Sequence, residues 1–219
     1  MEIELLLITN NAEELIEKSA RVCYNSKLNK SKRKVFLQSL IKKGHHSILE
    51  HATATFKISG ISRALSHQLV RHRLASYSQQ SQRYVDMNNF DYIIPPKIEN
   101  DYKLFNDYEN LMEQTRQLYS KMIKAGIKKE DARFILPNAT KTELIMTANF
   151  REWRHIIELR CSKKAQWEIR EVFKKILIML YDESPIVFED LYKIYIRRVT
   201  YNPCIGNLIF DNGNIRFIM

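Results

Sequence analysis

The 219-residue sequence contains only five glycines and five prolines, and no stretch rich in them divides the chain. No run of about 20 apolar residues is present to span a membrane. The acidic N-terminus lacks the basic start and the longer apolar stretch of a secretory signal. Three cysteines lie far apart without a CxxC pair, which argues against a zinc site and fits a reducing cytoplasm. We therefore expect one cytoplasmic domain over residues 1–219, with no membrane segment.

The composition is globular and basic. Hydrophobic residues make up 45% of the chain, which excludes a disordered protein. The net charge of +10 favours anionic partners: nucleic acid, acidic membranes or phosphorylated small molecules. A solvated basic surface without a partner is the plain alternative, and charge alone does not choose among these.

The hydrophobic pattern predicts an α+β fold, with several helices packed on a mostly antiparallel, interrupted sheet. The expected strands cover residues 2–8, 52–60, 84–94 and 139–148. The expected helices cover residues 12–22, 31–43, 61–71, 99–125, 128–136, 150–160, 164–181 and 185–195, with Ser31 as one N-cap. Residues 74–82 contain three serines and three glutamines and are predicted to form a loop. The tail at about 196–219 has a turn sequence between two apolar runs, which predicts a hairpin.

Three residues capable of positive charge, Arg71, His72 and Arg73, stand where a helix is expected to give way to the polar loop. Arginine offers a planar fork of donors that matches a phosphate, and histidine changes charge near neutral pH. Arg83 adds a further cation after the loop. The group could hold phosphates and the edge of a base or a flavin, or it could be a basic helix end beside a flexible loop.

The spacing of these residues is specific. Arg71-His72-Arg73 is followed by seven residues and then Ser81, and this pattern resembles the signature of the flavin-dependent thymidylate synthases. Further segments agree with that family in the same order: GHHSILEH at 44–51, Gln68 before the motif, Ala132-Arg133 before ILP, and NFREWRHIIELR at 149–160 leading into AQWEIR at 165–170. The resemblance covers roughly residues 40–172.

The resemblance implies an enzyme that methylates dUMP to dTMP, with FAD as cofactor and with NADPH and 5,10-methylenetetrahydrofolate as co-substrates. It also implies a homotetramer with active sites at subunit contacts. The residues implied to bind FAD are Ser47, Arg71, His72, Arg73, Gln79, Asn149, Arg151 and His155, with His45 and Glu50 close to the flavin. Those implied to bind dUMP are Gln68, Arg71, Gln79, Gln80, Ser81, Gln82, Arg83, Arg133 and Arg160. The position of Gln79 is often Glu in the family, and that of His155 is sometimes Asn.

These implied roles are chemically reasonable. Arg83 and Arg133 can each bind a phosphate dianion through two hydrogen bonds. A fixed cation at Arg160, near the uracil N3–O4 edge, would favour the N3-deprotonated form and push electron density to C5. Arg160 is therefore the expected catalytic residue. Cations beside the flavin would stabilise its anionic reduced form.

Several alternatives stay open. Ser81 could act as a nucleophile with His72 as its base, or it could only bind dUMP. His45, His46, Glu50 and His51 resemble a metal-binding group, but their spacing differs from HExxH and we expect no metal. A nucleic-acid-binding protein fits the charge, although no recognition-helix pattern is evident. A Rossmann dinucleotide-binding fold is not expected, because no GxGxxG motif follows a strand. A flavoprotein reductase without methyl transfer would keep the RHR motif but would not need Arg133 or Arg160.

Overall fold

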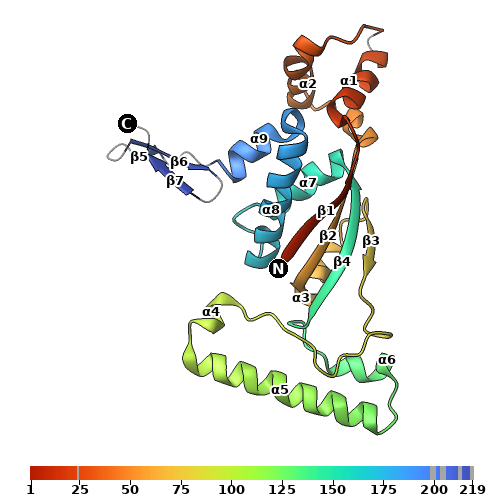
Figure 1. Ribbon diagram of the computed structural model, residues 1–219, viewed down its shortest axis with the longest axis vertical. Helices are drawn as coiled ribbons and strands as arrows, with labels where there is room; N and C mark the ends of the chain where they lie inside the picture. The colour runs from red at the N-terminus through yellow and green to blue at the C-terminus, as the bar shows by residue number, and fades with distance from the viewer. Residues whose placement is uncertain (24, 198–200, 203–205, 212–213, 218–219) are drawn as a thin grey trace. The chain divides into compact units, whose positions relative to one another are not determined.

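A computed structural model describes residues 1–23, 25–197, 201–202, 206–211 and 214–217 (Figure 1). Its chain divides into two compact units. Unit 1 comprises residues 1–4 and 55–147, and unit 2 comprises residues 5–54 and 148–219. Helices and a four-stranded sheet together confirm the α+β class. Whether the whole chain acts as one domain stays a prediction.

The four-stranded sheet has the order β1-β2-β4-β3. Its strands are β1 (Glu2–Ile8), β2 (Thr53–Ser62), β4 (Lys141–Asn149) and β3 (Ser76–Gln79). Side chains in β2 and β4 alternate between buried and partly exposed, as expected for strands with one face on a core. The prediction of a loop over 74–82 is wrong in part, because β3 pairs antiparallel with β4 there. The expected strand at 84–94 is also wrong, since the structure has only an isolated bridge between Tyr92 and Thr140.

Unit 1 carries one long helix and several short ones. They are α3 (Arg63–Leu69), α4 (Pro96–Glu99), α5 (Tyr102–Lys124), α6 (Lys129–Ala132) and the 3₁₀ helix η3 (Arg133–Ile135). The Asp101 carboxylate accepts from the first free backbone N–H groups of α5, and Gly126 follows its end with φ +85°. Met112 and Tyr119 of α5 are buried in a small core. Leu111 and Leu118 of the same helix are about half exposed, so only one of its apolar stripes is covered.

Unit 2 is mainly helical. It contains α1 (Ala12–Cys23), η1 (Lys30–Lys32), α2 (Arg33–Lys42), η2 (His46–His51), α7 (Phe150–Arg160), α8 (Trp167–Glu183) and α9 (Pro185–Tyr195). The predicted cap at Ser31 is wrong, because the Asn29 side chain accepts from the Lys32 backbone N–H and starts η1. The apolar Val35 of α2 is 73% exposed. Trp153 is buried, and its indole N–H donates to the Ala54 carbonyl.

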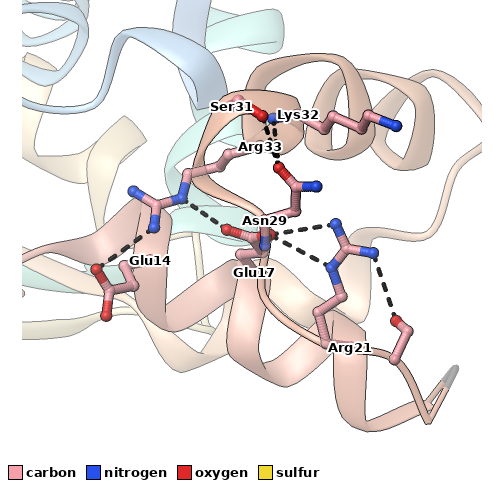
Figure 2. Close-up of polar contacts among 8 residues, drawn as sticks. Glu14, Glu17, Arg21, Asn29, Ser31, Lys32 and Arg33 are labelled. Atoms are coloured by element: carbon pink, nitrogen blue, oxygen red, sulfur yellow. Dashed lines mark hydrogen bonds and ion pairs between the residues drawn. The ribbon is translucent and has the colours of Figure 1, made fainter.

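A closed arginine cluster, formed by Arg21 and Arg33 around Glu17, ties α1 to α2 (Figure 2). The Glu17 side chain is fully buried and accepts from Arg33 Nε at 2.7 Å, Arg21 Nη2 at 3.2 Å and the Asn29 backbone N–H at 3.0 Å. Burial alone would raise the pKa of Glu17, but these hydrogen bonds together lower it. The carboxylate therefore stays charged and neutralised inside unit 2.

The tail contains β5 (Tyr201–Asn202), β6 (Gly206–Asp211) and β7 (Asn214–Phe217). Antiparallel pairing of β6 with β7 agrees with the predicted hairpin, although the predicted turn residues 212–213 and Cys204 lie outside the described residues. Across the described part of the chain, no helix is long and apolar enough to cross a membrane.

Candidate active site

The RHR motif lies in the turn that follows α3. The Ser62 hydroxyl accepts from the Leu65 N–H at 3.0 Å and starts the helix, and Gln68 stands near its end. After the helix, His72 is buried and its two neighbours, Arg71 and Arg73, are exposed. The two arginines are therefore available to a ligand, while His72 is packed into the turn.

Tyr77 of β3 fixes this turn. Its hydroxyl lies 2.8 Å from the Leu69 carbonyl and 3.1 Å from the His72 carbonyl, so one phenol links β3 to both the end of α3 and the RHR motif. The Leu69 carbonyl also accepts from the His72 N–H at 3.1 Å. Tyr77 was not predicted as a site residue. The only signal for it was an aromatic residue inside a serine- and glutamine-rich stretch.

The glutamine-rich loop is anchored on β4. Gln79 Nε2 donates to Thr142 Oγ1 at 3.3 Å, and the Gln80 N–H donates to the Glu143 carbonyl at 3.0 Å. Ser81 then begins a turn, because its hydroxyl oxygen accepts from the Arg83 N–H at 3.2 Å. Half-buried side chains at 79–82 give way to the exposed Arg83.

An open arginine cluster, formed by Arg63, Arg83 and Arg133, lies beside this turn. Arg83 forms an ion pair with Glu130 at 3.1 Å, and Arg133 Nε donates to the backbone carbonyl of Glu130 at 3.2 Å. Arg63 Nη1 donates to the Gln80 carbonyl at 3.3 Å. Two sequence-predicted phosphate ligands thus meet at one residue of α6.

Arg63 is the cation that the sequence analysis missed. It is the first residue of α3, and no acid in the described chain pairs with it. Burial lowers its pKa first, and the nearby charge of Arg133 lowers it further. Like charges held this close repel each other, so an anion bound between them would be favoured. A single charge inside the apolar junction ISRAL was the available sequence signal.

A cavity of about 430 Å³ is lined in part by Gln80. Its charged lining residues are Asp86, Asp91 and Glu143, with Lys141 as the one cation among its lining residues. Three carboxylates against one ammonium disfavour a phosphate there. The open arginine cluster is therefore the better anion site of the loop.

The remaining predicted FAD residues lie in unit 2, within or directly before η2 and α7. Asn149 Oδ1 accepts from the Glu152 N–H at 2.9 Å and caps α7, which leaves its amide N–H groups to donate elsewhere. Arg151 and His155 are exposed and stand one turn apart on α7, so they share a face. Arg151 is ion-paired with Glu50 of η2. Ser47 and His45 are exposed beside this pair.

Arg160 is the last residue of α7 and is half-buried. A cation at the C-terminal end of a helix is stabilised by the helix dipole. The predicted site residues are thus divided between the units: the RHR motif, Gln68, residues 79–83 and Arg133 in unit 1, and the other predicted residues in unit 2.

The histidine-rich segment makes contacts of its own. His46 Nε2 lies 3.1 Å from the Ile41 carbonyl, and Glu50 is committed to Arg151. These two of the four residues weighed as metal ligands therefore have other partners. Within the described residues, no group of three or more His, Cys, Asp and Glu lies placed to hold a metal ion.

Comparison with known proteins identifies the family. Residues 4–186 match the family described as thymidylate synthase complementing protein, and the chain belongs to this family. A flavin-dependent thymidylate synthase of Geobacter sulfurreducens is 43% identical, with the match covering 87% of this chain and 86% of the relative. One from Clostridium tetani is 38% identical, covering 86% of each chain. One from Pyrococcus abyssi is 48% identical over 69% of this chain and 64% of the relative.

Proposed function

We propose that this chain is a flavin-dependent thymidylate synthase, which converts dUMP to dTMP by reductive methylation. The observation that carries the proposal is the open arginine cluster beside Ser81, which contains Arg83 and Arg133, the two residues that the family resemblance implies as phosphate ligands. Among the described residues, only Arg83 of the three arginines is paired with an acid, and a phosphate dianion would neutralise the charge left over.

The dUMP ligands are divided by chemistry. Arg83 and Arg133 bind the phosphate, and Glu130 competes with it for Arg83. The other residues bind the sugar and base: Gln68, Arg71, Gln79, Gln80, Ser81, Gln82 and Arg160. Ser81 acts as a ligand and turn former, because its hydroxyl oxygen already accepts from the Arg83 N–H.

The donor set fits an anionic flavin. Arg71, Arg73 and Arg151 are exposed guanidinium groups, and Glu50 is tied to one of them. Neutral or titratable donors complete the set: Ser47, His45, His72, Gln79, Asn149 and His155. When bound, FAD would supply the reducing equivalents that NADPH provides and that the one-carbon unit of 5,10-methylenetetrahydrofolate needs. The protein side chains hold it and stabilise its negative charge.

Arg160 has the catalytic role. Its guanidinium, held at the end of α7, favours loss of the uracil N3 proton and so enriches C5 in electron density. A reductase without methyl transfer would have no use for this residue.

The assembly is proposed to be a homotetramer in the cytoplasm. Leu104, Leu111 and Leu118 recur every seven residues along α5 and are 52%, 56% and 49% exposed. A stripe of this spacing suits helix packing between copies of the chain. The cytoplasmic location stays a prediction.

The visible spectrum of the purified protein tests the proposal, followed by addition of dUMP and then by assay of dTMP. We expect flavin bands at roughly 370 and 450 nm that shift with dUMP, and dTMP formation with NADPH and the folate. NADPH oxidation without dTMP would indicate the reductase. A protein that takes up no FAD but binds nucleic acid with steep salt dependence would contradict the proposal.

A further inference from the structure

A second basic site lies in unit 2, past the end of α7. A cavity of about 490 Å³ is lined by Cys161, Lys163, Arg170, Lys174 and Tyr195. Lys163 comes from the segment between α7 and α8, and Arg170 and Lys174 stand one turn apart on α8. None of these residues was assigned a role by the family signature.

The cations of this cavity are only partly neutralised. Lys174 pairs with Glu171 at 3.1 Å, and both side chains keep contact with solvent. Arg170 Nη1 donates to the Lys163 carbonyl at 3.4 Å, which holds the guanidinium against the α7–α8 segment. Neither Lys163 nor Arg170 forms an ion pair within the described chain. Positive charge is therefore available to a bound anion.

The rest of the lining is neutral. Cys161 is 5% exposed, and burial raises the pKa of its thiol to about 12, so it carries no charge at neutral pH. The Tyr195 hydroxyl donates to the Glu158 carbonyl at 3.2 Å, and burial raises its pKa as well. A neutral, partly apolar interior with cations along it suits an extended organic anion better than an inorganic ion.

The position links the cavity to catalysis. Cys161 directly follows Arg160, the residue proposed to act on the uracil ring. The cavity therefore lies at the C-terminal end of α7, the same end of the helix that carries Arg160. Cations one helical turn apart have Cβ atoms about 5–6 Å apart. From that spacing, the long Arg170 and Lys174 side chains can reach two neighbouring carboxylates of one extended ligand.

We propose that this cavity binds the carboxylates of the γ-linked glutamates beyond the first on the folate co-substrate, an inference that rests on the proposed function. Lys163, Arg170 and Lys174 would each meet a carboxylate by a charge-assisted hydrogen bond. The other source of an anionic group is the phosphate of NADPH. The two sources differ in which co-substrate loses affinity when the cations are removed.

The kinetic test uses a Lys163→Gln/Arg170→Gln variant and 5,10-methylenetetrahydrofolate with one or with five γ-linked glutamates. For the five-glutamate form, we expect KM to rise about tenfold, with less than about twofold change for the one-glutamate form and for NADPH. Lys175→Gln is the matched control, because Lys175 is exposed on α8 and does not line the cavity. Equal KM changes for both folates, or a rise for NADPH alone, would overturn the proposal.

A binding measurement separates this proposal from the proposed function. Isothermal titration with γ-linked tetraglutamate should show binding to the wild-type protein that weakens in high salt and is lost in the double variant. Equal heats for both proteins would overturn the proposal. If tetraglutamate binds the wild-type protein as expected but no dTMP forms, the proposed function fails while the anion-binding cavity stands.

Discussion

Two groups of arginines in this chain meet carboxylates in opposite ways. In the closed arginine cluster, Glu17 is fully buried and both of its oxygens are hydrogen-bonded (Figure 2). In the open arginine cluster, Glu130 is 40% exposed and is the one acid paired there among the described residues. Neutralised charges hold elements together, whereas charge left over is available to a ligand. A group of arginines therefore does not by itself indicate a binding site. A group whose positive charge exceeds that of the acids paired with it does.

The largest expected effect is on stability, at the closed cluster. Glu17→Ala should lower the free energy of unfolding by about 3–5 kcal/mol, because Arg33 and Arg21 would lose a buried counter-charge. Denaturant unfolding measures this loss. Glu14→Ala is the matched control and should cost much less, since Glu14 is 40% exposed. Similar losses for both variants would contradict the distinction.

Because of the Glu17 carboxylate, we also expect the stability of the protein to depend on pH in the acid range. The pKa of Glu17 is lowered in the folded protein, so the stabilisation it gives is complete above the ordinary glutamate pKa of 4.5. It is lost as the pH falls through the lower, folded pKa. In unfolding measured against pH, Glu17→Gln should flatten this part of the acid dependence. An unchanged profile would show that other groups control it.

At the open cluster, the expected effect is on binding. Arg83→Gln should weaken dUMP about 10- to 100-fold, because a charge-assisted bond to phosphate is lost. Its stability should hardly change, since its ion pair with Glu130 is exposed. Calorimetric titration with dUMP measures the effect, with Lys141→Gln, an exposed cation paired with Asp91 in the same unit, as control. Loss of stability with unchanged affinity would make Arg83 structural.

Arg63 gives a smaller and more specific effect. Arg63→Gln should weaken dUMP about three- to tenfold, and removing its repulsion with Arg133 should leave the protein no less stable. Affinity and thermal unfolding should be measured on the same preparation. A variant that is clearly destabilised but binds dUMP normally would mean that Arg63 only anchors the Gln80 carbonyl.

The smallest effect on dUMP affinity is expected at Glu130, the acid of the open arginine cluster. Glu130→Gln should bind dUMP tighter by up to about fivefold, because the phosphate no longer competes with an exposed ion pair. The gain should shrink in high salt, where the pair is already screened. Weaker binding would show instead that Glu130 orients Arg83 for the phosphate.

Local sequence predicted the elements that carry their own signals. The residues of β1 are mostly apolar, and β4 contains an apolar run. The helix α5 begins at a capping Asp101, and α7 and α9 also have clear starts. All of these elements were predicted within a few residues. β3 was missed because its partner β4 comes more than 60 residues later, and serine and glutamine favour loops in isolation. Val35 and Val70 are apolar but exposed, because hydrophobic periodicity alone does not say which apolar positions are covered by other elements.

In the candidate site too, the sequence predicted some features and missed others. The motif spacing named Arg83 and Arg133, but nothing local showed that they meet at Glu130 or that Arg63 joins them. Tyr77 holds the RHR turn by hydrogen bonds to backbone carbonyl groups. Because every residue has a backbone carbonyl, the sequence does not show which of them a side chain will bind. Motifs thus identify ligands, while the structure identifies what positions them.

The most direct test compares the affinities of dUMP and deoxyuridine, which differ only in the phosphate. In the wild-type protein we expect dUMP to bind about 100-fold tighter or more. In an Arg63→Gln/Arg83→Gln/Arg133→Gln variant that remains folded, that advantage should fall to a few-fold while deoxyuridine affinity stays the same. If the variant keeps the full advantage of dUMP, the phosphate binds elsewhere and the open arginine cluster is not its site.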